Sequence, residues 1–279
     1  MKVNDIKELE KKANHIRMNI IKQVYAAKSG HPGGALSCVD ILTVLYFNQM
    51  NIDSKEPDAL QRDRFVLSKG HASPALYATL AERGYFSQDE LKRFRNIESN
   101  LQGHPDMNKV KGVDATTGSL GQGLSIANGM AMNSKMNHDG YRVYCLLGDG
   151  EIEEGQVWEA AMTASHYQLD NLCVIVDNNN LQIDGNIEDV AGLNHIEEKF
   201  KSFGFETLTI DGHNFKDILE AFQVAKKTKE RPTAIVAKTV KGKGVSFMEN
   251  QAGWHGKAPN EEQYKQAIME LSNAIISEN

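Results

Sequence analysis

Carboxylate and amide side chains follow two apolar segments of the sequence, and Asn179 lies thirty residues after Asp149. The first apolar run ends in Gly-Asp-Gly at 148–150, and the second occupies 172–176. Glycines let a backbone approach a ligand closely, and the start of a following helix favours a phosphate. Asp149 would repel that phosphate unless a cation lay between them, and Mg²⁺ combines one or two protein oxygens with phosphate oxygens. Gly-Asp-Gly alone is typical of a tight turn. With Asn179 at this spacing it predicts a phosphate and divalent-cation site, to which Leu181 can add a backbone carbonyl.

Four of the nine histidines lie in loops beside glycine: His31, His71, His104 and His255. A single histidine in a turn is more often a hydrogen-bonded structural residue than a functional one. Four of them, in a chain with a predicted phosphate and cation site, indicate a polar pocket instead. Imidazole suits such a pocket because it can donate, accept and transfer a proton near neutral pH.

The segments around these residues alternate between strands and helices. Continuous apolar runs predict strands covered on both faces, at 64–68, 144–147, 172–176, 205–210 and 233–239. Apolar residues at steps of three or four predict helices, at 6–27, 37–48, 74–83, 126–136, 215–226 and 261–276. This alternation indicates an α/β fold with a doubly wound, mostly parallel sheet. Because no repeat or linker divides the sequence, we expect residues 1–279 to form a single domain. In the second helix, Ser37 and Asp40 are spaced like a capping box.

The composition excludes several classes of protein. Lys and Arg number 31 against 37 Asp and Glu, and a net charge of −6 is unfavourable for binding nucleic acid. The charged N-terminal residues do not form a signal peptide, and the apolar run at 38–47 is too short to span a membrane. The three cysteines are widely spaced and form no Cys-x-x-Cys pair. We therefore expect a cytoplasmic protein without disulfides or a zinc site.

The motif at 148–150 with Asn179 resembles the thiamine diphosphate motif of thiamine-dependent enzymes, and other segments narrow the resemblance to transketolase. Four segments resemble that family in its own order: Lys-Ser-Gly-His-Pro-Gly at 28–33, Phe-Val-Leu-Ser-Lys-Gly-His-Ala at 65–72, Thr-Thr-Gly-Ser-Leu-Gly-Gln-Gly at 116–123 and Trp-His-Gly-Lys at 254–257. The resemblance covers essentially the whole chain, but only the N-terminal, diphosphate-binding part of the family's usual subunit. The chain therefore resembles the N-terminal subunit of a split transketolase, with the thiamine-diphosphate-binding α/β fold.

The resemblance implies roles for particular residues of this sequence. The catalytic residues that it implies, which would hold sugar hydroxyls and face the reacting centre, are His31, His104 and His255. The residues that it implies in contact with thiamine diphosphate are His71, Gly118, Ser119, Leu120, Gly150, Asn179, Lys241 and His255. The implied Mg²⁺ ligands are Asp149, Asn179 and Leu181, and Ca²⁺ or Mn²⁺ could substitute. His213 also matches a family motif, and we interpret it as a turn residue or helix cap.

The implied reaction moves a two-carbon ketol unit from a ketose phosphate, xylulose 5-phosphate by default, to an aldose phosphate of the pentose phosphate pathway. The family's pyrimidine-binding and C-terminal domains have no counterpart here. We therefore expect a partner subunit to carry them, and we expect the chain alone to be inactive. Two copies of each chain would form a heterotetramer. Glu154 and Glu159 match acidic positions at the family's subunit interface, although a solvated helix start explains them equally well.

Two alternatives remain open. The α subunit of a 2-oxoacid dehydrogenase shares the Gly-Asp-Gly and Asn motif, but it would leave the segments at 29–32 and 254–256 unexplained. The other is a non-catalytic regulatory or thiamine-diphosphate-binding subunit that keeps the cofactor fold. Asp149, Asn179 and the four loop histidines argue against it, because a purely structural role needs none of them. A dinucleotide site is excluded by spacing, because residues 118–123 read Gly-x-x-Gly-x-Gly instead of Gly-x-Gly-x-x-Gly after a strand.

Overall fold

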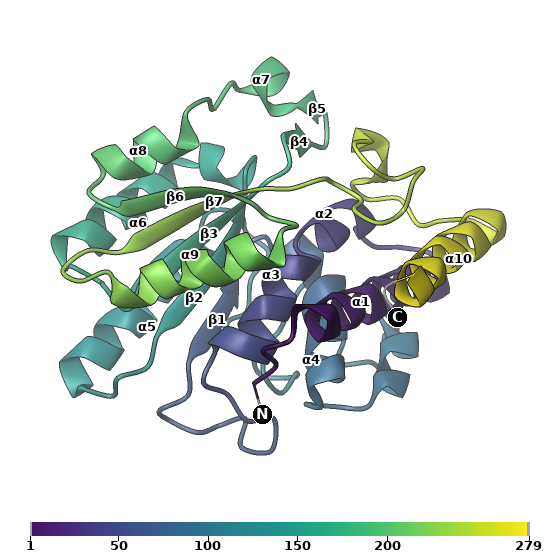
Figure 1. The fold of residues 1–279 in the computed structure, drawn as a ribbon, viewed down its shortest axis with the longest axis horizontal. Helices are drawn as coiled ribbons and strands as arrows, with labels where there is room; N and C mark the ends of the chain where they lie inside the picture. The colour runs from purple at the N-terminus through teal and green to yellow at the C-terminus, as the bar shows by residue number, and fades with distance from the viewer. Residues whose placement is uncertain (1, 278–279) are drawn as a thin grey trace.

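The computed structural model describes residues 2–277, and its centre is a parallel sheet of five strands (Figure 1). The strands are β1 (Arg64–Leu67), β2 (Val143–Gly148), β3 (Leu172–Asn178), β6 (Glu206–Asp211) and β7 (Thr233–Lys238). Their order across the sheet is β1-β2-β3-β7-β6, and every neighbouring pair is parallel. The predicted α/β fold and mostly parallel sheet are therefore confirmed. All five predicted strands are present, within two residues at each end.

Helices cover both faces of the sheet (Figure 1). One core includes side chains of α1 (Ile6–Ala27), α3 (Val39–Val44), α4 (Ser73–Arg83) and α9 (Phe215–Lys227). The other includes side chains of α5 (Gly123–Asn137), α6 (Gly155–His166) and α8 (Ile196–Ser202). Side chains alternate along a strand, so Tyr144 and Leu146 enter the first core while Cys145 and Leu147 enter the second. Burial on both faces explains why β2 is continuously apolar.

Shorter elements complete the fold. A short helix, α2 (Pro32–Ser37), precedes α3, and β4 (Leu181–Gln182), β5 (Gly185–Asn186) and α7 (Ile187–Val190) follow β3. The last helix, α10 (Glu261–Ser277), packs on α1, where the rings of Tyr25 and Tyr264 stack at 4.1 Å. Short 3₁₀ helices occupy Gly70–Ala72, Gln88–Arg93, Glu151–Glu153 and Ala252–Trp254.

The helix predicted at 37–48 is wrong in its details. The chain forms α2, then α3, and then a π-helical turn at Leu45–Gln49. Ser37 caps nothing: its hydroxyl donates to the carboxylate of Asp177 at 2.5 Å and to the carbonyl of Gly34 at 3.2 Å. A buried carboxylate at the end of β3 is a strong, charged acceptor, and its bond to the hydroxyl holds Ser37 beneath the site described below.

None of the helices in the described part of the chain combines the length and apolar character that crossing a membrane requires. The three cysteines, Cys38, Cys145 and Cys173, are buried and free of disulfides. Burial raises the pKa of the Cys38 and Cys173 thiols to about 12, so both are protonated and behave as small apolar side chains.

Candidate active site

Two strand ends meet beside each other at the carboxyl edge of the sheet. Gly148 of β2 is in register with Asp177 of β3, which brings the loops that follow both strands together. Asp149 is 3% exposed, and its carboxylate accepts hydrogen bonds from the backbone N–H groups of Gly150 at 2.9 Å and Asn180 at 2.6 Å. The two loops are thus joined by Asp149, as the thirty-residue spacing predicted.

A cavity of about 260 Å³ lies over these strand ends. Its lining includes the predicted site residues His31, His71, Gly118, Leu120, Asp149, Gly150, Asn179, Leu181, Lys241 and His255. His104 and Ser119 are outside the lining and exposed to solvent, although the ring of His104 lies against Gly118. The structure therefore gathers residues from distant parts of the chain into one pocket, and it leaves these two at the surface beside it.

A larger cavity, of about 620 Å³, lies between α8 and the ends of β6 and β7. Its charged lining residues carry both signs, with Glu188, Glu197 and Glu198 facing the same space as Lys201 and Lys238. Size alone would favour this cavity as a binding site. The smaller one is the better candidate, because it combines glycine loops, hard oxygen donors and buried cations at the carboxyl edge, where parallel sheets bind their ligands.

Three histidine rings pack together on one side of the smaller cavity. The ring centroids of His31, His71 and His255 are 5.1 to 5.5 Å apart. Burial, followed by the charge of Arg95, lowers the pKa of His31 to about 4. Burial and Lys241 lower the pKa of His255 to about 3. Both imidazoles are therefore neutral at pH 7, so each can donate one hydrogen bond and accept another.

The side chain of Lys241 contacts two residues of the cavity lining, Leu181 and His255. Its Nζ donates to the carbonyl of Leu181 at 2.9 Å and lies 3.0 Å from Nδ1 of His255. Burial, with the charge of Lys69 second, lowers the pKa of Lys241 to about 8. At neutral pH the ammonium is still protonated, and it is positioned to meet an anion in the cavity.

The floor of the cavity is a buried ion pair that we did not predict from the sequence. Lys69 donates to the carboxylate of Asp177 and to the carbonyl of Gly34, and both charged side chains are almost fully buried. Hydroxyl groups of Ser37 and Thr239 donate to the same carboxylate. Burial alone would raise the pKa of Asp177, but Lys69 and these hydroxyls outweigh it and hold the pKa below its usual value.

Glu151 is a further buried acid, 3% exposed, that joins two glycine loops. Its carboxylate accepts from the backbone N–H groups of Gly121 and Gly148, each at 3.0 Å, and from the hydroxyl of Ser68. Glu154 and Glu159, the acids that we associated with a subunit interface, are both exposed. Of these three glutamates only Glu151 is buried, and its hydrogen bonds fix the two glycine loops beside the cavity.

Comparison with known proteins identifies the family. Residues 9–273 match the family described as transketolase, thiamine diphosphate binding domain. The chain belongs to the transketolase family. This confirms the resemblance that the sequence motifs showed, and it identifies the region as the part of a transketolase that binds thiamine diphosphate.

Relatives of two lengths match this transketolase chain. One of the subunits of the apulose-4-phosphate transketolase of Phocaeicola vulgatus is 42% identical over 270 residues, which cover 97% of this chain and 96% of the relative. The 6-deoxy-6-sulfo-D-fructose transketolase subunit SqwG of a Clostridium species is 43% identical, with 95% and 96% covered. Human transketolase is 44% identical over 98% of this chain, which spans only 43% of the human protein.

The structure of transketolase from Campylobacter jejuni matches the fold of this transketolase chain with a TM-score of 0.90. It is 35% identical and covers 99% of this chain, while the match spans 46% of the Campylobacter chain. The fold is therefore the thiamine-diphosphate-binding α/β fold of transketolases.

The residues of this transketolase chain fit the cofactor and cation that the family implies. In residues 2–277 there is no cluster of three or more His, Cys, Asp or Glu side chains suited to a metal ion. The predicted set instead combines the Asp149 carboxylate, the Asn179 amide oxygen and the Leu181 carbonyl. These are hard donors suited to Mg²⁺, and phosphate oxygens would complete its coordination. Burial and the nearby Asp177 raise the pKa of Asp149 to about 6. A bound cation would offset both effects by stabilising the ionised carboxylate.

A pH dependence follows from Lys241. We expect the affinity for pyrophosphate to fall by about tenfold per pH unit once the pH exceeds about 8, because the ammonium then loses its proton before it meets the anion. Calorimetric titration at pH 7 to 10 measures the effect. The Lys241→Arg variant is the control, since arginine keeps its charge across this range. Identical pH profiles for the two proteins would contradict a role for Lys241 in binding the anion.

Proposed function

We propose that this chain is the N-terminal, diphosphate-binding subunit of a split transketolase. With a partner subunit that carries the pyrimidine-binding and C-terminal domains, it transfers a two-carbon ketol unit from a ketose phosphate to an aldose phosphate. The observation that carries the proposal is the cavity where Asp149 and Asn179 meet, lined by His31, His71 and His255. The match to nearly the full length of two proteins named as transketolase subunits supports the division between two chains.

In this proposal the chain's own residues bind the cofactor and hold the sugar. Asp149, Asn179 and Leu181 hold Mg²⁺, which binds the diphosphate of thiamine diphosphate. The other groups in contact with the cofactor are His71, Gly118, Ser119, Leu120, Gly150, Lys241 and His255. Bound thiamine diphosphate supplies the carbanion and electron sink, chemistry that no amino-acid side chain offers.

Histidines carry the remaining tasks. His31 and His255 lie in the cavity as neutral imidazoles, and they orient sugar hydroxyls and transfer protons as carbon–carbon bonds break and form. His104 lies outside the lining, next to Gly118, where it meets the part of the sugar that extends out of the cavity. A position at the surface suits this role, because the partner subunit would cover it.

Three ketoses are candidate substrates. Xylulose 5-phosphate and the pentose phosphate pathway are the default for a transketolase. The two subunit relatives are named for different compounds, apulose 4-phosphate and 6-deoxy-6-sulfo-D-fructose, and these names support testing more than the default ketose. The substrate test therefore includes all three compounds, with release of CO₂ from 2-oxo acids as the measurement for the dehydrogenase alternative.

The assembly that we propose is a heterotetramer of two copies of each chain in the cytoplasm, consistent with three cysteines that are all free. Closed symmetry would place two active sites at interfaces between unlike chains. Glu154 and Glu159, exposed in this chain, would lie between the paired sites.

The partner requirement is directly testable. We expect the purified chain with Mg²⁺ and thiamine diphosphate to give no ketose cleavage above background. Adding the product of a neighbouring reading frame with the pyrimidine-binding domain should restore turnover of at least one ketose. Robust turnover by the chain alone would contradict the proposed division. Turnover with neither arrangement, or CO₂ release from a 2-oxo acid, would contradict the proposed reaction.

A further inference from the structure

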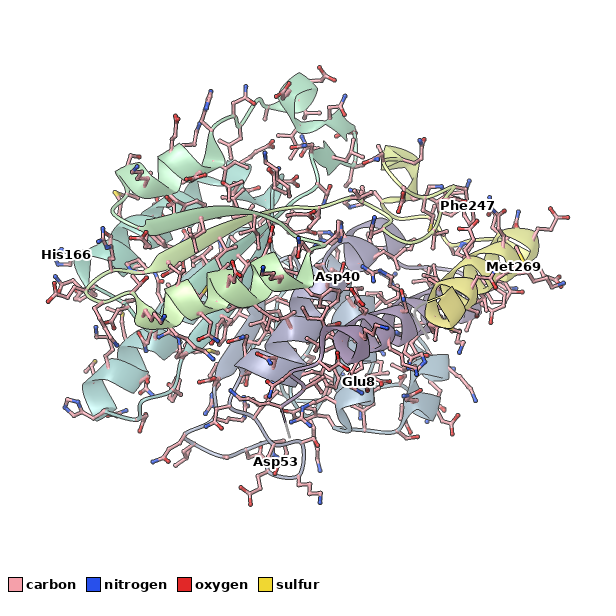
Figure 2. The ribbon with its side chains drawn as sticks, viewed as in Figure 1. Glu8, Asp40, Asp53, His166, Phe247 and Met269 are labelled. Carbon is pink, nitrogen blue, oxygen red and sulfur yellow. The ribbon has the colours of Figure 1, made fainter. Side chains whose placement is uncertain are left out.

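A buried cluster of charged and polar side chains lies outside the lining of the cavity. Its centre is Asp40 of α3, which is 2% exposed and lies in the interior beside the start of α9 (Figure 2). One oxygen of Asp40 accepts from Nη2 of Arg17 at 2.6 Å and lies 2.7 Å from Nδ1 of His213. Burial alone would raise the pKa of Asp40, but Arg17 and His213 outweigh it and leave the pKa below its usual value. The carboxylate is therefore ionised and acts as an acceptor.

The second ring nitrogen of His213 fixes the chain just before Lys241. The backbone N–H of Val240 donates to Nε2 of His213 at 2.8 Å. A backbone N–H can only donate, so Nε2 carries no proton and the proton of the neutral ring lies on Nδ1. Nδ1 then donates to Asp40. The ring thus forms two directional bonds, one to a buried anion and one to the loop after β7.

The loop after β7 is otherwise tied down around Lys241 by its backbone. Gly242 N donates to the carbonyl of Gly33 at 3.0 Å, and Asn250 N donates to the carbonyl of Lys241 at 2.9 Å. Neither bond involves Val240, the residue before Lys241. Its carbonyl accepts from Lys243 N at 3.1 Å within the loop, and its N–H donates to His213. The bond to His213 links the residue before the lysine to the side chain of Asp40 through a single ring.

Of the two interpretations of His213, turn residue is confirmed and helix cap is wrong. The cap of α9 is Asn214, whose side chain accepts from the backbone N–H groups of Lys216 and Asp217. His213 is also unnecessary for neutralising Asp40, because Arg17 already pairs with the same oxygen. The imidazole instead provides Nε2 as an acceptor for the Val240 N–H.

We infer that His213 is a positioning residue for the diphosphate site. Its bond to Asp40 orients the ring, and the ring in turn holds the Val240 N–H so that Lys241 points into the cavity. This inference rests on the proposed function, because it takes the anion in the cavity to be a diphosphate. It assigns no contact between His213 and the ligand.

Two conservative variants distinguish the hydrogen bond of His213 to Val240 from the volume that the side chain fills. Glutamine in His213→Gln carries an oxygen near the place of Nε2 and can still accept from Val240. Asparagine in His213→Asn reaches only the place of Nδ1, so it keeps the bond to Asp40 and loses the one to Val240. We expect His213→Asn and His213→Phe to raise the dissociation constant of pyrophosphate with Mg²⁺ by about tenfold, and His213→Gln to stay within about threefold of the unmodified chain. Equal losses in all three variants would contradict the inference.

A double variant tests whether the effect passes through Lys241. If it does, adding His213→Asn to Lys241→Met changes the dissociation constant by less than about twofold, because the group being positioned is gone. Additive losses would overturn the inference. The matched control is His166→Phe, an exposed histidine at the edge of the molecule far from Asp40 (Figure 2), for which we expect no change.

Two further measurements keep the outcome clear. Nitrogen chemical shifts of His213 in the unmodified chain report the tautomer without any substitution, and a ring protonated on Nε2 would overturn the inference even if the variants failed to fold. An unmodified chain that bound neither pyrophosphate nor thiamine diphosphate with Mg²⁺ would contradict the proposed function itself. Normal binding by the unmodified chain and by His213→Asn would contradict only the positioning role.

Discussion

Replacing Asp149 with asparagine or alanine should lower the affinity for thiamine diphosphate in the presence of Mg²⁺ by at least about 100-fold, with a comparable loss of ketol transfer. Asp149 supplies the only carboxylate in the predicted ligand set, since Asn179 offers an amide oxygen and Leu181 a carbonyl. Without it the cation keeps no charged protein ligand, and nothing offsets the charge of the diphosphate on that side. Calorimetric titration of the cofactor with and without Mg²⁺ measures the loss.

In the absence of ligands, the Asp149→Asn chain should be at least as stable as the unmodified chain. Burial and Asp177 raise the pKa of Asp149 to about 6, above its usual value. A raised carboxyl pKa means that folding disfavours the ionised form, so the charge costs stability at pH 7 and that cost fades as the pH falls below about 6. Asp149→Asn removes the charge and should melt at an equal or higher temperature.

The matched control is Asp53→Asn, in an exposed turn (Figure 2), for which we expect neither binding nor stability to change. Cofactor binding that survives Asp149→Ala would favour a subunit without a catalytic role and contradict the proposed cation site. A large loss of stability in Asp149→Asn would show instead that the carboxylate is structural.

Replacing Lys69 with methionine should destabilise the chain by about 3–5 kcal/mol, the largest stability effect that we expect from one substitution. Lys69 pairs with Asp177, and the two side chains are 2% and 0% exposed. Removing the ammonium leaves a buried carboxylate with only hydroxyl and amide donors. The free energy of unfolding in urea, measured at pH 7, gives the size of the effect.

An exposed ion pair provides the control for this prediction. Lys92 pairs with Asp89 at 2.7 Å, but their side chains are 78% and 82% exposed. Lys92→Met should leave the free energy of unfolding unchanged within error, because water screens that pair. The double variant Lys69→Met with Asp177→Leu should recover part of the loss, since no charge remains buried. A Lys69→Met variant as stable as Lys92→Met would show that the pair does not hold the floor of the cavity.

The strand ends could be predicted from the sequence because a parallel sheet brings consecutive carboxyl ends to one edge. The apolar runs before Asp149 and Asn179 gave both positions, and the parallel pairing of the two strands brought their ends together. An antiparallel pair would have placed them at opposite edges of the sheet. The histidines were harder, since His31, His71 and His255 lie far apart in the chain. Only their glycine neighbours, and the resemblance to transketolase, indicated that they share a pocket.

The parts that the sequence did not predict depend on contacts over long sequence distances. Lys69 and Asp177 are 108 residues apart, and nothing in either local pattern indicates that they pair. Ser37 has the spacing of a capping residue, yet the carboxylate of Asp177 competes successfully for its hydroxyl. Glu151 resembles its acidic neighbours until the glycine loops that surround it are in place.

A crystal structure of the chain with Mg²⁺ and thiamine diphosphate, grown with its partner subunit, tests the central claim most directly. We expect one octahedral cation at about 2.1 Å from oxygens of Asp149, Asn179 and Leu181, and bonded to the diphosphate. Lys241 and His71 should contact the same diphosphate from the other side of the cavity. A diphosphate bound in the larger cavity beside α8, or a cation that omits Asp149, would contradict the claim.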